Sequence, residues 1–247
     1  MTELFDTHAH FEGSESEIAE TLERAAAAGV TRIMAVGGSE SLNRGVELAA
    51  SSSVEGIKIY RAIGWDRDQI AQEPGELDYS DVAAVGEIGL DYHYSPDTRK
   101  AQIYLMARQL ELANGLGLPV VIHTREADDD TLGILREVPS RGIIHCFTGS
   151  PKFCRALLDL GFMISISGIV TFRAADNVRE SALIVPDDRL LVETDSPFLA
   201  PVPLRGSANE PAFITHTAAF LAGLRKMPYE DLAALTMRNA IATLGGG

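Results

Sequence analysis

Short apolar runs recur along the chain, and a helical pattern of apolar positions follows most of them. The runs are rich in β-branched residues and predict strands. They cover residues 4–10, 31–37, 57–65, 82–91, 119–124, 142–147, 161–168 and 189–195. Strands that alternate with helices over 247 residues are typical of a TIM (β/α)8 barrel. The pattern therefore predicts an α/β protein in which residues 1–247 form one domain.

Helix boundaries are marked by capping residues. Ser14 stands three positions before Glu17, the spacing of a capping box, and Gly29 stands where a helix would end. Further helices are predicted over 98–115, after Ser150-Pro151, from Glu210-Pro211 and over 228–243. The polar segment 66–81 predicts only a short helix.

A doubly wound open sheet is the structural alternative to the barrel. Such a sheet normally carries a glycine-rich phosphate loop after its first strand. Neither GxGxxG nor GxxxxGK[ST] occurs in the chain. The barrel is therefore the preferred prediction.

Potential metal ligands end several of the predicted strands. They are His8, His10, Glu87, His123, His145 and Asp195. In a barrel the carboxyl ends of the strands meet at one face and build the active site. His8 and His10 are two positions apart on one strand, so both are expected to point inward. The barrel would therefore bring all these side chains together.

Four imidazoles and two carboxylates are more ligands than one tetrahedral ion uses. They suit two divalent ions that share a carboxylate. We expect Glu87 to bridge, His8, His10 and Asp195 to bind one ion, and His123 and His145 to bind the other. Such a pair of ions lowers the pKa of a bridging water, and Asp195 is the residue expected to accept its proton. The ligands do not distinguish Mg, Mn and Zn.

Each of these residues, taken alone, also has a structural explanation. Two histidines on a strand can be satisfied by local hydrogen bonds, Asp195 can cap a turn, and Glu87 can pair with an arginine. Their shared position at strand ends favours the metal site. Cys146 alternates with His145, so it is expected to point outward as a buried thiol beneath the helices.

Composition restricts the partners and the compartment. The formal charge is −14, which argues against a broad basic groove for duplex nucleic acid but not against an enzyme that binds one or two phosphates. Cys146 and Cys154 form no CxxC motif, so a reducing cytoplasm is expected. The N-terminus has no signal-peptide pattern, and no apolar run is long enough to span a membrane. No membrane partner is expected, and the oligomeric state is not predicted.

Ordered motifs resemble those of the TatD-like metal-dependent hydrolases, the TatD deoxyribonucleases of the amidohydrolase-like barrel superfamily. They are FDTHAHF, GEIGLDY, PVVIHTREA, IIHCFTGS, GFMISISGIVTF, ETDSPFLAP and RGSANEP. The resemblance implies a TIM barrel, two divalent metal ions and phosphodiesterase activity, often as a 3′-to-5′ exonuclease on DNA. The family's ligand pattern falls on the six residues that the strand argument selects. The implied substrates are nucleic-acid ends or a small phosphoester.

One loop departs from the family pattern. After the third strand the family usually reads Gly-x-His-Pro-His, whereas this chain reads GWDRDQ. Asp66 and Asp68 replace the histidines, and Arg67 replaces the proline. Two acids there would repel a phosphate backbone, and Arg67 partly offsets this. The departure leaves the metal ligands intact and bears on the substrate.

Neighbouring residues are expected to support the ligands or the substrate. Arg125 lies two positions after His123 and is expected to bind a phosphate oxygen. Arg205 and Asn209 in RGSANEP are expected to contact substrate at the mouth of the site. Hydrogen-bonded support of the ligands is expected from Asp6, Glu12, Asp91 and Glu193.

Two other functions stay open. The same metal site could hydrolyse an amide, a lactone or another small phosphoester, or the barrel could bind metal without catalysis. Related barrels that cleave amides or lactones often carry a carboxylated lysine on the fourth strand. This chain has Glu87 and no lysine in that strand, which favours phosphoester hydrolysis.

Overall fold

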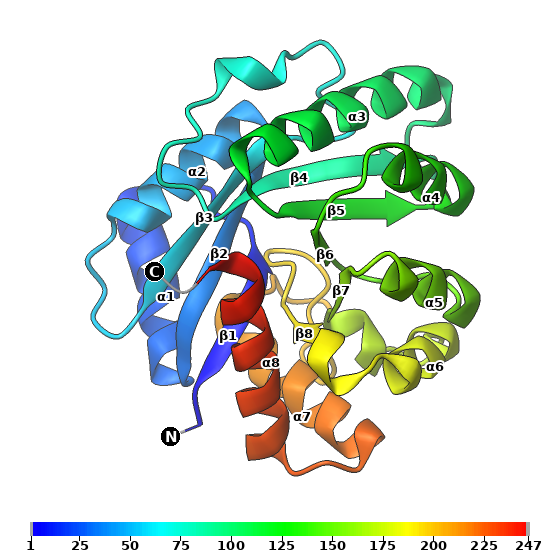
Figure 1. Cartoon of the computed structure of the whole chain (residues 1–247). Coiled ribbons are helices and arrows are strands. Elements are labelled where there is room, and N and C mark those ends of the chain that lie inside the picture. The colour runs from blue at the N-terminus through cyan, green and yellow to red at the C-terminus, as the bar shows by residue number, and fades with distance from the viewer. Residues whose placement is uncertain (1, 246–247) are drawn as a thin grey trace.

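The eight predicted strands form one parallel sheet in the computed structural model, which describes residues 2–245. The strands lie side by side in the order of the chain (Figure 1). They are β1 (Leu4–Ala9), β2 (Val30–Gly38), β3 (Lys58–Trp65), β4 (Ala84–Asp91), β5 (Val120–Arg125), β6 (Gly142–Ile144), β7 (Met163–Ile166) and β8 (Leu190–Val192). The prediction of a TIM barrel is confirmed. β6 and β8 are shorter than predicted, so His145 and Asp195 lie just beyond them.

The first and last strands meet at the carboxyl end of the barrel. A single β-bridge joins Ala9 to Ser196. The His10 amide donates to the Ser196 carbonyl over 2.8 Å, and the Asp195 amide donates to the His8 carbonyl over 2.9 Å. These hydrogen bonds join β1 to the segment after β8. They therefore also hold the predicted ligands His8, His10 and Asp195 next to one another.

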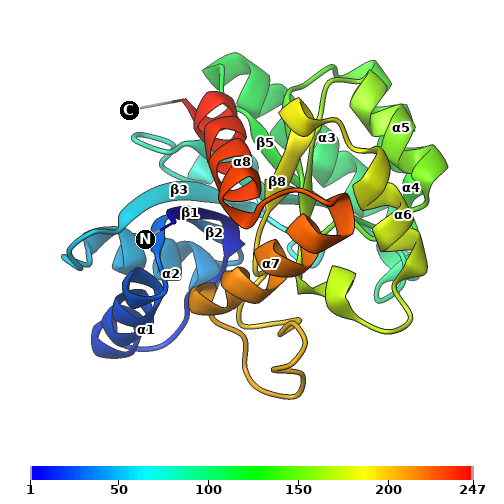
Figure 2. The same cartoon turned by 90° about the horizontal axis from the view of Figure 1, so that it is seen from below.

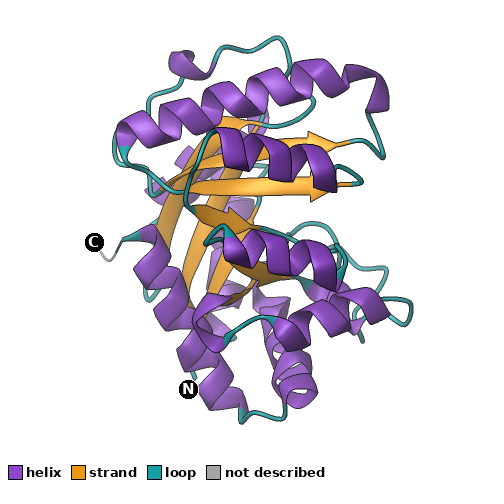
Figure 3. Cartoon of the chain, turned by 45° about the vertical axis from the view of Figure 1, so that its right-hand side comes forward, coloured by secondary structure: helices purple, strands orange, loops and turns teal. Residues whose placement is uncertain are grey.

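Within residues 2–245, eight α-helices surround the strands (Figure 3). They are α1 (Glu15–Ala27), α2 (Glu40–Ser51), α3 (Arg99–Leu116), α4 (Asp128–Glu137), α5 (Pro151–Asp159), α6 (Asp176–Ile184), α7 (Ile214–Arg225) and α8 (Tyr229–Leu244). The predicted capping box of Ser14 and Glu17 is present at α1. The segment 66–81 forms only a 3₁₀ turn at Pro74–Glu76, and Pro211 opens a 3₁₀ turn that precedes α7. None of these helices is long and apolar enough to cross a membrane.

Two apolar layers hold the barrel together. The larger layer lies between the strands and the surrounding helices. The second layer takes side chains from every strand, among them Phe5 and Val121, and from Met237 and Leu244 of α8. It therefore fills the barrel interior, and α8 covers the end at which the strands begin (Figure 2). Polar residues occupy the opposite end of the interior.

Candidate metal centre

The six predicted ligands converge at the carboxyl ends of the strands. His10, Glu87, His123, His145 and Asp195 line a cavity of about 440 Å³. His8 is fully buried beside them, with its Nε2 atom 3.1 Å from His10 Nε2. Residues from β1, β4 and β5 and from the segments after β6 and β8 thus share one site.

Glu87 lies between two groups of histidines. Its Oε2 atom is 3.5 Å from Nε2 of both His8 and His10. Its Oε1 atom is 3.4 Å from His123 Nδ1 and 3.5 Å from His145 Nε2. Asp195 Oδ1 lies on the first side, 3.9 Å from His8 Nε2 and 3.7 Å from His10 Nε2. Each carboxylate oxygen of Glu87 therefore faces a different half of the site.

The outer nitrogens of three histidines face oxygen acceptors. His10 Nδ1 lies 2.8 Å from the Val36 carbonyl, and His123 Nε2 lies 3.1 Å from Asp91 Oδ2. His145 Nδ1 lies 3.4 Å from Glu193 Oε1. A proton on each outer nitrogen leaves the lone pair of the inner nitrogen directed into the site, which is the arrangement that metal-binding histidines have. Asp91 and Glu193 are thus placed as their predicted supporting roles require.

Burial and close charges shift the titration of the site. Burial alone would raise the pKa of Glu87, but attraction to His145 and hydrogen bonds from the histidines hold that pKa well below its usual range. Burial opposes the charged form of His145, yet Glu87 and Glu193 raise its pKa well above normal. At His8, burial and the neighbouring His145 lower the pKa. The buried carboxylates thus favour positive charge at the centre of the site.

The donor set fits divalent ions. Two overlapping groups, His8–His10–Glu87 and Glu87–His123–His145, each place three ligand atoms within 4.8 Å of one another. Within the groups, neighbouring atoms are 3.1 to 3.5 Å apart. A tetrahedral ion with bonds of about 2.0–2.1 Å holds its ligands roughly 3.3 Å apart. The side chains of these residues could therefore hold a metal ion on each side of Glu87.

The backbone turns sharply after two of the short strands. Cys146 and Asp195 both have positive φ angles, 43° and 59°. Such angles are uncommon for residues other than glycine and cluster at functional sites. The prediction that Cys146 points outward is wrong, because β6 ends at Ile144 and the alternation of the strand does not continue. Cys146 instead lines the cavity, with Sγ 3.2 Å from Ser167 Oγ.

Asp6 supports the junction between β1 and the segment after β8. Its Oδ1 atom accepts hydrogen bonds from the backbone amides of His8 and Thr194, and Oδ2 accepts one from the Thr194 hydroxyl over 2.5 Å. Burial raises the pKa of Asp6 to about 8. Asp6 thus binds the backbone on both sides of this junction, at His8 and at Thr194. Glu12, predicted to act similarly, is exposed and lines a different cavity, beside α2.

The three predicted substrate residues lie in different surroundings. Arg125 lines the cavity, and its guanidinium group stacks on Tyr94 at 4.8 Å. Arg205 stacks on Phe172 at 3.7 Å and is not among the residues that line the cavity. Asn209 is buried, and its amide nitrogen donates to the carbonyls of Thr194 and Phe198. The amide of Asn209 thus supports the loop after β8, and contact of Asn209 with substrate stays a prediction.

Other lining residues were not predicted as substrate contacts. Arg67 donates from Nη1 to Glu87 Oε1 over 3.3 Å. Tyr94 and Phe198 border the cavity with exposed rings, 67% and 58% accessible. The sequence indicates these two residues only by their proximity to residues of the site. Tyr94 follows Asp91 by three positions, and Phe198 follows Asp195 by three. Aromatic type alone does not show which ring remains exposed.

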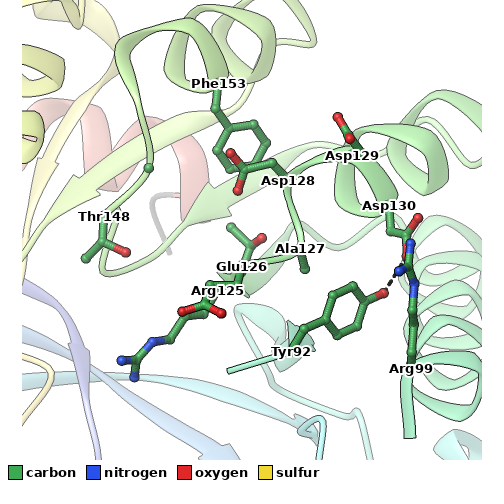
Figure 4. A pocket seen from close by; sticks show the side chains of 12 residues that line it. Tyr92, Arg99, Arg125, Glu126, Ala127, Asp128, Asp129, Asp130, Thr148 and Phe153 are labelled. Carbon is green, nitrogen blue, oxygen red and sulfur yellow. Dashed lines mark hydrogen bonds and ion pairs between the residues drawn. The ribbon is translucent and has the colours of Figure 1, made fainter. Parts of the chain in front are cut away.

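A second cavity of about 700 Å³ adjoins the first and shares Thr124, Arg125 and Thr148 with it (Figure 4). On its far side, the Tyr92 hydroxyl and Arg99 Nε both donate to Asp130 Oδ2. The side chain of Arg125 points away from that group. Arg125 thus stands where the two cavities meet.

Comparison with known proteins agrees with this site. The family model described as TatD related DNase matches residues 5–245. The chain is 39% identical to "Uncharacterized metal-dependent hydrolase YabD" of Bacillus subtilis, over 96% of this chain and 97% of that protein. It is 32% identical to "3'-5' ssDNA/RNA exonuclease TatD" of Erwinia billingiae, over 90% of each.

A solved structure shows the same architecture over the whole length. The crystal structure of YJJV, a TatD homologue from Escherichia coli K12, has a TM-score of 0.88 and 27% identity, and the match covers 100% of this chain and 99% of that one. Family match, full-length relatives and fold all agree. The chain belongs to the TatD-related DNase family and is a metal-dependent hydrolase of that family.

Proposed function

We propose that this chain hydrolyses phosphodiester bonds at the ends of single-stranded nucleic acid, in the 3′-to-5′ direction, with two divalent metal ions. The observation that carries this proposal is the position of Glu87. Each of its carboxylate oxygens faces a separate pair of histidine nitrogens at 3.4 to 3.5 Å. A carboxylate shared in this way is characteristic of two-metal hydrolytic sites.

The ligand roles follow from the two halves of the site. His8, His10 and Asp195 would hold one ion, His123 and His145 would hold the other, and Glu87 would be shared. Mg, Mn and Zn are the candidate ions. When bound, such ions supply an activated water at neutral pH and stabilise charge on a phosphoryl group. The free cysteines fit a reducing compartment, and we place the enzyme in the cytoplasm.

The remaining roles belong to the protein side chains. Asp195 borders the cavity and would accept the proton of the attacking water. Arg125 carries a cation at the same cavity and would bind a non-bridging phosphate oxygen. Asp91 and Glu193 would orient the rings of His123 and His145 through the contacts described above.

The cavity mouth suits a single strand better than a duplex. Tyr94 and Phe198 offer exposed aromatic faces on which unpaired bases can stack. The net charge of −14 disfavours contact with a long, highly charged duplex. The relative named as a 3′-5′ ssDNA/RNA exonuclease supports the same substrate class.

A small phosphoester is the second candidate substrate. The loop that follows β3 holds Asp66 and Asp68 next to Arg67, which lines the cavity, and these acids would repel a second backbone phosphate. The cavity of about 440 Å³ is within the usual range for small-molecule sites. A panel of nucleotides, aryl phosphates, lactones and amides would separate this candidate from the nuclease.

The test is cleavage of a 5′-labelled single-stranded oligonucleotide with Mn²⁺ or Mg²⁺. We expect products shortened from the 3′ end, and we expect His123→Ala to lose at least about 100-fold in rate. His216→Ala, which removes an imidazole from α7, is the matched control and should behave as wild type. Equal cleavage by His123→Ala and wild type would contradict the proposal.

A further inference from the structure

The two halves of the proposed metal centre have unequal surroundings. On the His8–His10 side, Glu87 Oε2 faces the two imidazoles, and Asp195 adds a second carboxylate 3.7 to 3.9 Å from them. On the His123–His145 side, Glu87 Oε1 faces two imidazoles and also a guanidinium group. On the inner side of the imidazoles, the first half thus has an additional carboxylate and the second half has a fixed cation. The carboxylates of Asp91 and Glu193 contact only the outer nitrogens of the second half.

The guanidinium group belongs to Arg67. Its Nη1 atom donates a hydrogen bond to Glu87 Oε1 over 3.3 Å. The same oxygen lies 3.4 Å from His123 Nδ1 and 3.5 Å from His145 Nε2. An ion held by this half would take Glu87 Oε1 as a ligand, because this carboxylate oxygen faces both imidazoles. Arg67 therefore contacts the oxygen that such an ion would need.

Arg67 is held in place by its own loop. Its Nε atom lies 3.3 Å from Asp68 Oδ2, and Asp68 Oδ1 accepts a hydrogen bond from Ser95 Oγ. The Asp68 amide donates to Asp66 Oδ1 over 2.8 Å, and the Asp66 amide donates to the Gly38 carbonyl. Only 22% of the Arg67 side chain is exposed. The cation is thus a built part of the site and not a free surface side chain.

The start of the loop is also anchored. Gln109 of α3 accepts a hydrogen bond from the Trp65 amide and donates one to the Trp65 carbonyl, at 2.8 and 2.7 Å. These bonds fix the backbone two residues before Arg67.

We propose that Arg67 makes the two metal positions unequal, so that the His8–His10–Asp195 position binds a divalent ion more tightly than the His123–His145 position. The reason is that an ion at the second position must share Glu87 Oε1 with a cation or displace it, and like charges at this distance repel. This inference rests on the metal centre of the proposed function. It adds the cation of Arg67 to a difference that the ligand numbers already favour, since three residues besides Glu87 serve the first position and two serve the second.

The test is titration of metal-free protein with Mn²⁺. Binding is monitored by calorimetry and by the electron paramagnetic resonance signal of free Mn²⁺. Wild type should bind two ions in steps that differ by about tenfold or more in Kd, the scale on which residues around a metal site act. In Arg67→Ala the weaker Kd should tighten by at least about fivefold, while the tighter Kd changes by less than about twofold.

Two further variants control the experiment. Arg155→Ala removes the same charge from an exposed position on α5 and should leave both steps unchanged. Arg67→Lys keeps the charge and should keep the two steps apart. Arg67→Gln serves in place of Arg67→Ala if circular dichroism shows that the alanine variant does not fold. Two equal steps in wild type, or an unchanged gap in the Arg67 variants without charge, would overturn the inference.

The outcome is separable from that of the proposed function. Two unequal steps that converge in Arg67→Ala, together with no cleavage of nucleic acid, would refute the proposed substrate and leave the inference intact. Cleavage with equal metal steps would refute the inference alone. Failure to bind any divalent ion would refute both.

Discussion

Glu87 and Asp195 are both carboxylates of the candidate metal centre, but their contacts differ. Glu87 lies within 3.5 Å of four histidine nitrogens, whereas Asp195 approaches only His8 and His10, at 3.9 and 3.7 Å. A residue shared by both halves is suited to binding, and a residue at one edge remains accessible to a water. We therefore propose Asp195 as the residue that accepts the proton of the attacking water.

Asp195→Asn should lower the rate of phosphodiester cleavage by roughly 10²- to 10⁴-fold, because an amide cannot accept the proton of the attacking water. The measurement is the initial rate on a single-stranded oligonucleotide at saturating Mn²⁺. Asp188→Asn, at an exposed position just before β8, is the matched control. A variant that keeps more than a tenth of the wild-type rate would show that Asp195 is not the base.

Asp66 should make the metal-free protein less stable as the pH rises. Burial raises its pKa from 3.8 to about 6 in the folded state. The folded protein therefore binds this proton more tightly than the unfolded chain, and stability present at pH 4 is lost as the pH passes 6. In urea unfolding with chelator, Asp66→Asn should exceed wild type by about 1–3 kcal/mol at pH 7.5 and by close to zero at pH 4. Parallel pH profiles of the two proteins would contradict this account.

At the scale of elements, helix α2 packs very closely against the chain that leaves β1. A Cβ atom at Gly45 would lie 1.8 Å from the Phe11 carbonyl oxygen. Phe11 follows His10 directly, so the contact between α2 and this segment also positions a proposed ligand. The other helical glycine of interest, Gly133 of α4, has nothing within 4 Å of such a Cβ.

Gly45→Ala should lower the free energy of unfolding by about 1–3 kcal/mol, because the added methyl group forces α2 away from β1. Gly133→Ala is the matched control and should raise the free energy of unfolding by about 0.5–1 kcal/mol, since alanine favours a helix and meets no neighbour. Urea unfolding of both variants gives the comparison. Equal stability of Gly45→Ala and wild type would mean that α2 does not pack as described.

The strands and the shared position of the ligands could be predicted from the sequence. Apolar runs mark the strands, and a parallel barrel brings their carboxyl ends to one face whatever the loops do. That rule alone places His123 of β5 beside His145, although they lie 22 positions apart. The supporting roles of Asp91 and Glu193 could be predicted in the same way, because each residue lies near a ligand in the sequence.

The remaining features depend on loop geometry that the alternation of residues does not encode. Cys146 turns into the cavity because β6 stops at Ile144 and the backbone enters a positive-φ turn. The Asn209 amide donates to a backbone carbonyl of the loop after β8, and Arg67 donates to the carboxylate of Glu87, 20 positions away. Such pairings follow from the path of each loop and not from a local pattern.

At the scale of the whole molecule, the proposed metal binding would be coupled to folding through the junction of the first and last strands. His8, His10 and Asp195 lie at this junction, where two backbone hydrogen bonds and a bond from the Thr194 amide to the Asp6 side chain join segments almost 190 positions apart. Ligands that converge only in the folded state make a bound ion stabilise that state.

Removal of metal should therefore lower the melting temperature. At an ion concentration of about 100 times Kd, binding contributes about 2.7 kcal/mol, which corresponds to roughly 5–10 °C for a protein of this size. Differential scanning calorimetry with Mn²⁺ and with chelator gives the shift. The double variant His8→Ala/His10→Ala should show a much smaller shift, and an equal shift in that variant would place the stabilising ion elsewhere.

Six residues are proposed to hold two divalent ions on the two sides of Glu87. Anomalous diffraction from crystals grown at saturating Mn²⁺ would locate such ions. Two anomalous peaks are expected, one among His8, His10 and Asp195 and the other between His123 and His145, with Glu87 shared. The absence of anomalous density at Glu87, or peaks only at other residues, would contradict this proposal.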